Sequence, residues 1–164
     1  MVEVKLIDID RSKLARKKRI QPPDSPSLRV LIADDNDAFR TDLRQFLERQ
    51  EYVDVVGEAG NGMRAINLSQ ALRPDLILLD ISMPGIAGPE AVRVIKRIAP
   101  DSKIVFVSVH EEGIYRDLVQ QMGLGGFISK RELKEHLPRV LDTFKRIKGC
   151  PTSDRGRAGD HADA

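Results

Sequence analysis

Side chains able to do chemistry stand directly after the apolar runs of this sequence. They are two neighbouring carboxylates, a third carboxylate, a hydroxyl and an ammonium group: Asp34 and Asp35, Asp80, Ser108, and Lys130. The run before Asp80, Leu76 to Leu79, has no polar residue, which is typical of a strand covered on both faces. If the strands are parallel, their carboxyl ends share one edge of the sheet, where ligands of such sheets bind.

The three carboxylates predict a magnesium site. They share one crevice if the strand order reverses between the first and third runs, and crowded carboxylates raise one another's pKa unless a cation neutralises them. Mg²⁺ prefers oxygen ligands and accepts a few carboxylates while keeping several waters. We therefore expect Mg²⁺ as the cofactor.

Such a site suits phosphoryl transfer, which needs mainly positioning and charge neutralisation. Asp80 is the preferred nucleophile, forming an acyl phosphate, because it stands alone at the centre of the sheet. Asp34 and Asp35 are then left to hold the metal. The Lys130 ammonium would balance the charge of the transferred group, and the Ser108 hydroxyl would bond one of its oxygens.

Each of these residues also has a plain structural interpretation. Asp34 and Asp35 could cap the following helix, Ser108 could cap a later one, and Lys130 could be a solvated surface residue. The coincidence of all of them at strand ends favours the functional interpretation.

Strand patterns alternate with helical patterns along the chain. The expected strands are Leu28–Ala33, Val53–Ala59, Leu76–Asp80, Lys103–Ser108 and Gly126–Ser129. The expected helices are one after Asn36 and then Met63–Leu72, Pro89–Ile98, Glu111–Met122 and Arg131–Arg146, the last bent or shortened at Pro138. This alternation predicts an α/β fold with a doubly wound, five-stranded parallel sheet.

Composition divides the 164 residues into three parts. Residues 1–27 carry seven Lys or Arg against four Asp or Glu and read as a flexible basic leader; residues 28–147 form the domain; residues 148–164 read as a disordered polar tail. The domain carries seventeen basic against eighteen acidic residues, so we expect no direct binding of nucleic acid. One cysteine and the lack of a long apolar run predict a cytoplasmic protein without membrane contact.

Four stretches resemble the receiver domain of two-component response regulators: RVLIADDN, PDLILLDISMPGIAG, SVH and GFISK. The resemblance covers roughly Leu28 to Phe144 and implies a flavodoxin-like sheet of order 2-1-3-4-5. It further implies that Asp80 accepts phosphate from a histidine kinase or phosphotransfer protein. Mg²⁺ would be held by the three carboxylates and the backbone carbonyl of Ser82. Phe127 would be the switch aromatic that turns inward in the active state.

The same resemblance assigns tuning roles to Ser82 and His110, which overlook the acyl phosphate. It implies a signalling protein rather than a turnover enzyme, addressing a downstream protein that the sequence does not identify. Homodimerisation through the face of the fourth and fifth helices is one option, although Ile114 and Tyr115 fit a core position equally well.

Three alternatives stay open at this point. The stretches EAGNG and DISMPG resemble those of receivers that precede a LuxR-type helix-turn-helix domain. The chain is therefore expected to be either a stand-alone receiver or the receiver part of a DNA-binding regulator. A Mg²⁺-dependent hydrolase with an Asp nucleophile is a second alternative, disfavoured because such enzymes carry an acid two residues after the nucleophile, where this chain has Ser82. A third is an interaction module that keeps only the fold.

Overall fold

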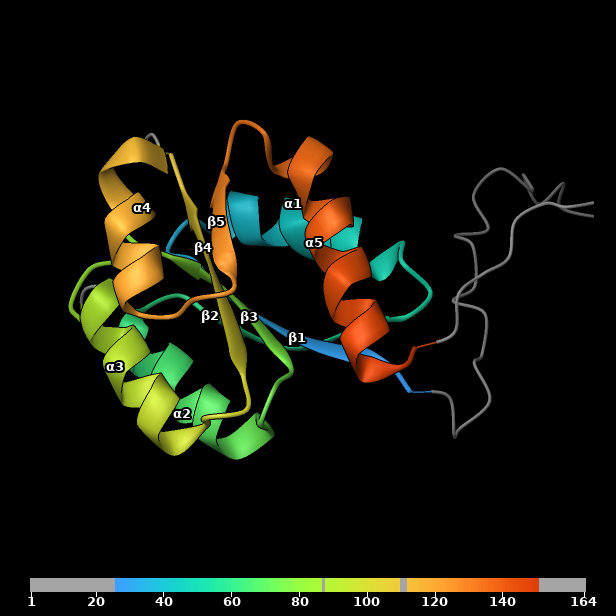
Figure 1. The fold of residues 1–164 in the computed structure, drawn as a ribbon, viewed down its shortest axis with the longest axis horizontal. Helices are drawn as coiled ribbons and strands as arrows, with labels where there is room; N and C mark the ends of the chain where they lie inside the picture. The colour runs from blue at the N-terminus through green and yellow to red at the C-terminus, as the bar shows by residue number, and fades with distance from the viewer. Residues whose placement is uncertain (1–25, 87, 110–111, 151–164) are drawn as a thin grey trace, which may run out of the picture.

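The molecule is a parallel sheet with helices on both faces (Figure 1). The structure is a computed structural model, and it describes residues 26–86, 88–109 and 112–150. Its five strands follow the order β2-β1-β3-β4-β5, which confirms the predicted fold class and order. The strands are β1 (Leu28–Ala33), β2 (Val53–Ala59), β3 (Leu76–Asp80), β4 (Lys103–Ser108) and β5 (Gly126–Ser129). The helices are α1 (Asp37–Glu48), α2 (Gly62–Leu72), α3 (Gly88–Ile98), α4 (Glu112–Gln121) and α5 (Leu133–Lys148).

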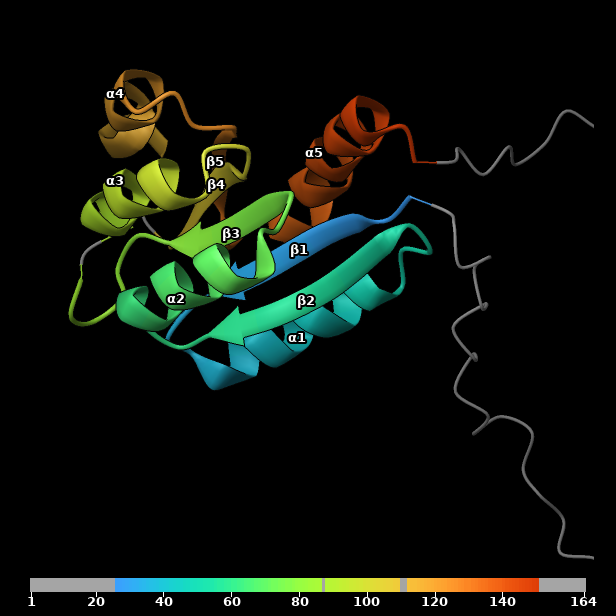
Figure 2. The ribbon, with the colours of Figure 1, turned by 90° about the horizontal axis from the view of Figure 1, so that it is seen from below.

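The central strand β3 is buried along its whole length, because helices cover both faces of the sheet (Figure 2). Its pairing with β1 is in register from Val30 opposite Leu76 to Ala33 opposite Leu79. The next residue of each strand is a carboxylate, so this register alone brings Asp34 beside Asp80.

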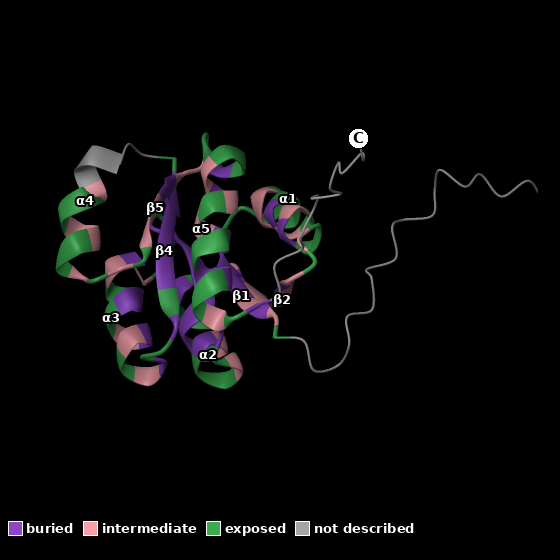
Figure 3. Cartoon of the chain, turned by 45° about the vertical axis from the view of Figure 1, so that its right-hand side comes forward, coloured by how far each residue is buried: buried purple, intermediate pink, exposed green. Residues whose placement is uncertain are grey.

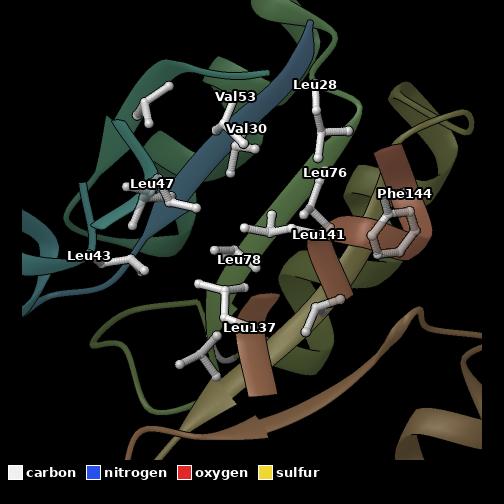
Figure 4. Close-up of a cluster of buried hydrophobic side chains, with 14 of the residues drawn as sticks. Leu28, Val30, Leu43, Leu47, Val53, Leu76, Leu78, Leu137, Leu141 and Phe144 are labelled. Atoms are coloured by element: carbon white, nitrogen blue, oxygen red, sulfur yellow. The ribbon is translucent and has the colours of Figure 1, made fainter. Parts of the chain in front are cut away.

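The sheet divides the apolar core into two clusters. Alternate residues of β1 point to opposite faces, so Val30 and Ile32 join the cluster under α1 and α5, whereas Leu31 and Ala33 join the cluster under α2, α3 and α4. Figure 4 shows the first cluster, and Figure 3 shows buried strands between helices whose outer faces are exposed. Within the described residues, no helix is both long and apolar enough to cross a bilayer.

Asparagine side chains begin two of the helices. Asn36 accepts a hydrogen bond from the backbone N–H of Phe39 at 3.0 Å, and Asn61 accepts one from Arg64 at 2.8 Å. Since Asn36 occupies the N-cap position of α1, neither Asp34 nor Asp35 does, and their structural interpretation as caps is wrong.

Helix α5 starts and ends two residues later than expected, and Pro138 lies inside it without ending it. Of the residues that the sequence placed in the polar tail, Lys148 is the last residue of this helix, Gly149 is its C-cap and Cys150 follows. Lys148 forms an ion pair with Asp75, and Cys150 is buried in the cluster under α1 and α5. Two segments lie outside the described residues: residues 1–25, which are most of the predicted leader, and residues 151–164.

The phenol of Tyr52 is held against the last turns of α5. Lys145 Nζ lies 4.2 Å from the centre of its ring, and its hydroxyl faces Asp142 Oδ1 at 3.5 Å. Burial, followed by the charge of Asp142, raises the pKa of Tyr52 to about 12.

This raised pKa predicts that the fold loses stability in alkali. Between the ordinary pKa of about 10 and the folded value of about 12, the unfolded phenol releases its proton while the folded one keeps it, so stability falls as pH rises through this window. Tyr52→Phe should remove roughly 1 kcal/mol of that fall, because the half-buried ring is partly screened by solvent. Urea unfolding at about pH 9 and about pH 11 measures it, with Tyr115→Phe as the control; equal pH dependence in wild type and Tyr52→Phe would contradict it.

Candidate functional site

Three of the predicted site residues meet at the carboxyl edge of the sheet. Asp34 follows β1, Asp80 ends β3 and Lys130 follows β5. The Lys130 Nζ lies 2.5 Å from Asp34 Oδ2 and 2.9 Å from Asp80 Oδ2. The ammonium group therefore bridges two carboxylates that come from neighbouring strands.

The carboxylates of Asp34 and Asp80 are both buried. Asp34 is 1% exposed and Asp80 is 4% exposed. Each has a backbone amide on its other oxygen: Asn36 N–H donates to Asp34 Oδ1 at 2.9 Å, and Ser82 N–H donates to Asp80 Oδ1 at 3.0 Å. Turns immediately after each strand thus fix the orientation of the two acids.

Burial and charge act in opposite directions on these groups. Burial raises the pKa of Asp34, the Lys130 ammonium and the Asn36 amide lower it, and the charge of Asp80 raises it, with a net upward result. Burial lowers the pKa of Lys130, but the contacts with Asp34 and Asp80 outweigh it and raise the value. The ammonium group is therefore charged at neutral pH, and it stabilises two carboxylates that would otherwise repel.

The acidic residues form a cluster suited to a hard cation. Oxygens of Asp34, Asp35 and Asp80 all lie within 4.8 Å of one another, and Asp35 is exposed at the mouth of the cluster. The buried Asp34 Oδ2 is paired with the Lys130 ammonium at 2.5 Å, and Asp35 adds a further carboxylate to the two that this single cation bridges. Three carboxylates served by one ammonium group fit a hard cation that prefers oxygen ligands.

The hydroxyl and the aromatic residue lie on the neighbouring strands. Ser108 is fully buried at the end of β4, and its carbonyl accepts the backbone N–H of Lys130 at 2.7 Å. Phe127 in β5 is half-buried, and its ring stacks on that of Tyr115 from α4 with 6.0 Å between ring centres. Tyr115 is therefore packed against the cluster under α2, α3 and α4, whereas the Ile114 side chain is outside what the structure describes.

The loop after Asp80 is closed by a glycine contact. The N–H of Gly88 donates to the carbonyl of Ile81 at 3.2 Å, and a Cβ at Gly88 would lie 2.8 Å from the Ile81 Cα. Glycine is required there so that α3 can begin against the backbone beside the acid. Ser82 is exposed on this loop, as a tuning position requires; His110, the other predicted tuning residue, lies outside the described residues.

Two residues of the first turn of α1 complete the site, and their roles do not follow from sequence. Phe39 places its ring under Lys130, with Nζ 4.4 Å from the ring centre. Arg40 donates from Nη1 to the backbone carbonyl of Asp34 at 2.7 Å. In the sequence, Phe39 is one of several apolar residues at helical spacing, and Arg40 carries no motif of its own.

Residues 30–142 match the response regulator receiver domain, so the chain belongs to this family of two-component signalling modules. Response regulator GacA of Pseudomonas aeruginosa is 40% identical over 118 residues, which cover 71% of this chain and 55% of that protein. Response regulator UvrY of Escherichia coli (strain K12) is 40% identical over 103 residues, covering 63% and 47%. The chain thus spans about half the length of the curated relatives it matches.

Solved structures of receiver domains have the same fold. The signal receiver domain of NarL from Mycobacterium tuberculosis superposes with a TM-score of 0.67 at 32% identity, covering 73% of this chain and 98% of that one. The isolated receiver domain of RcsB from Salmonella enterica serovar Typhimurium, solved with the phosphomimetic BeF3−, gives 0.68 at 27% identity, covering 78% and 94%. The predicted resemblance to receiver domains is confirmed.

Proposed function

We propose that this chain is a phosphoryl-accepting switch in which Asp80 takes a phosphoryl group from a histidine kinase or phosphotransfer protein. The observation that carries the proposal is the arrangement of Asp80, with Lys130 Nζ at 2.9 Å from one oxygen and the Ser82 amide at 3.0 Å from the other. A carboxylate held in one orientation beside a fixed cation is poised to attack an incoming phosphorus atom.

The transfer forms one bond and breaks one. A carboxylate oxygen of Asp80 attacks the phosphorus of a phosphohistidine, the P–N bond breaks, and the electron pair returns to the donor imidazole. The product is an acyl phosphate on Asp80. Lys130 offsets the added negative charge, and the Ser108 hydroxyl bonds one of the phosphoryl oxygens.

We assign Mg²⁺ to the acidic cluster, held by Asp34, Asp35, Asp80 and the carbonyl of Ser82. When bound, the ion supplies neutralisation of the phosphoryl charge. The support from this chain is the chemistry of its donors: three carboxylates have oxygens within 4.8 Å of one another, and two of them are buried.

The readout of phosphorylation would pass through β4 and β5. Ser108 and Lys130 are joined by a backbone hydrogen bond, and Phe127 lies between them and α4 through its stacking on Tyr115. Contraction of Ser108 and Lys130 around a phosphoryl group would favour a changed position of Phe127 and of the α4, β5 and α5 face. Ser82 and His110 would tune access of water to the acyl phosphate.

We infer that phosphorylation changes the protein partner in the cytoplasm. The receiver accepts one phosphoryl group rather than turning over substrate. The alternative is the receiver part of a LuxR-type DNA-binding regulator, which the greater length of GacA and UvrY favours. A homodimer through the α4 to α5 face suits either version.

The proposed function predicts single, metal-dependent labelling. Incubation of the full chain with acetyl phosphate and Mg²⁺ should add one phosphoryl group per chain by intact mass, and chelation of Mg²⁺ should abolish the addition. Equal labelling with and without the chelator would show that the transfer does not need Mg²⁺. Steady release of coloured product from p-nitrophenyl phosphate would instead favour the hydrolase.

A further inference from the structure

We infer that Arg40 is a positioning residue for the acidic cluster: it sets the Asp34–Asp35 segment so that the cluster can bind Mg²⁺, an inference that rests on the proposed function. Its guanidinium is the group that holds the backbone of this segment from the helix side. Nη1 donates to the Asp34 carbonyl at 2.7 Å.

The hydrogen bond to the Asp34 carbonyl fixes a peptide plane. On the amide side, Asp34 N–H donates to the carbonyl of Ala59 in β2 at 2.9 Å, as the last rung of the sheet. On the carbonyl side, Arg40 holds the peptide that joins Asp34 to Asp35. Because Asp34 is buried and Asp35 is exposed, the orientation of this peptide decides whether both carboxylates face the same point.

Arg40 is itself held in place. Its side chain is only 17% exposed; Nη2 pairs with Asp37, and Nε lies 3.9 Å from Glu58 Oε1. The guanidinium is anchored by its hydrogen bonds to the Asp34 carbonyl and to Asp37, and its planar fork of donors can act as a rigid spacer between α1 and the end of β1.

The charge of Arg40 and its hydrogen bond predict opposite effects on metal binding. A cation beside the acidic cluster repels Mg²⁺, so loss of charge alone should tighten binding. Loss of the Asp34 hydrogen bond should weaken it, by about tenfold as for other partners that orient metal ligands. The sign of the change therefore separates positioning from simple electrostatics.

Arg44 provides a matched control one turn further along α1. It is a partly exposed arginine that pairs with the same Glu58, through Nη1 and Oε2 at 2.5 Å. No hydrogen bond joins Arg44 to the Asp34 segment among the described residues. Arg44→Gln therefore removes the same charge and the same acidic partner while the Asp34 carbonyl keeps its donor.

The test compares Arg40→Gln, Arg40→Lys and Arg44→Gln in the full chain. Calorimetric titration of Mg²⁺ should show about tenfold weaker binding for Arg40→Gln, unchanged or tighter binding for Arg44→Gln, and partial recovery for Arg40→Lys. Without metal, amide hydrogen exchange by NMR should be faster at Asn36 in Arg40→Gln than in Arg44→Gln, because the Asn36 amide reports the Asp34 turn.

Two results would overturn the inference: Mg²⁺ binding as tight in Arg40→Gln as in Arg44→Gln, or equal exchange at Asn36 in the two variants. Failure of the proposed function looks different. Wild type would then bind no Mg²⁺, which removes the metal role of Arg40 as well, while the exchange data decide by themselves whether Arg40 holds the segment.

Discussion

Replacement of Asp80 by Asn should reduce labelling by acetyl phosphate to background. The amide keeps the shape of the carboxylate and can still accept from the Ser82 N–H, but it has no nucleophilic oxyanion to form an acyl phosphate. Intact mass and acid-quenched phosphate counting measure the loss. Since Lys130 keeps its ion pair with Asp34, the variant should remain folded.

The control for this experiment is Asp42→Asn, which makes the same change of a carboxylate to an amide at an exposed acid on α1. It should label like wild type. Labelling of Asp80→Asn at the wild-type level would move the acceptor to another residue, and peptide mapping of the labelled chain would then identify it.

Replacement of Lys130 by Met should destabilise the metal-free protein by about 3 kcal/mol at neutral pH. Removal of one partner from a buried ion pair leaves uncompensated charge, and here two carboxylates that are 1% and 4% exposed would face each other. Urea unfolding at pH about 7 measures the difference. The loss should shrink in acid, because protonation removes the repulsion, and it should shrink when Mg²⁺ is added, because the ion replaces the missing cation.

A double variant tests the cause of that destabilisation. Lys130→Met with Asp34→Asn removes one of the two opposed charges and should recover part of the lost stability, which a simple packing defect would not allow. Lys134→Met, at an exposed position of α5, is the matched control and should unfold like wild type. An equal free energy of unfolding for Lys130→Met and Lys134→Met would show that the bridge contributes nothing.

Strand ends were the part of the site that the sequence could predict. Asp34, Asp80 and Lys130 each follow an apolar run, and the parallel order of the sheet brings the ends of such runs together whatever the details of packing. Alternation of strand and helix patterns can be recognised in a single sequence, and it predicts parallel strands because their crossover connections contain helices.

The helix residues behind the site could not be predicted in the same way. Arg40 donates to the backbone carbonyl of Asp34. Every residue has such a carbonyl, so no residue type in the sequence identifies the acceptor. Phe39 has the spacing of a core residue, but spacing gives the face of a helix and not the neighbour on that face. The contact of its ring with Lys130 depends on how α1 sits against β5.

The end of α5 shows the same limit. Lys148 and Cys150 stand in a polar stretch without helical spacing, and a contact with Asp75, far away along the chain, holds the first of them. Long-range pairing of this kind overrides local preference, and it moved the end of the helix beyond the residue at which periodicity stops.

The sheet that divides the apolar core also makes the packing of its two halves largely independent. Among the described residues, the buried side chains under α1 and α5 form one cluster and those under α2, α3 and α4 form another, because the backbone of the sheet lies between them. A change of side-chain volume on one face is therefore compensated on that face alone. Substitutions under one pair of helices can therefore be accommodated without repacking the opposite half of the core or moving the acids at the strand ends.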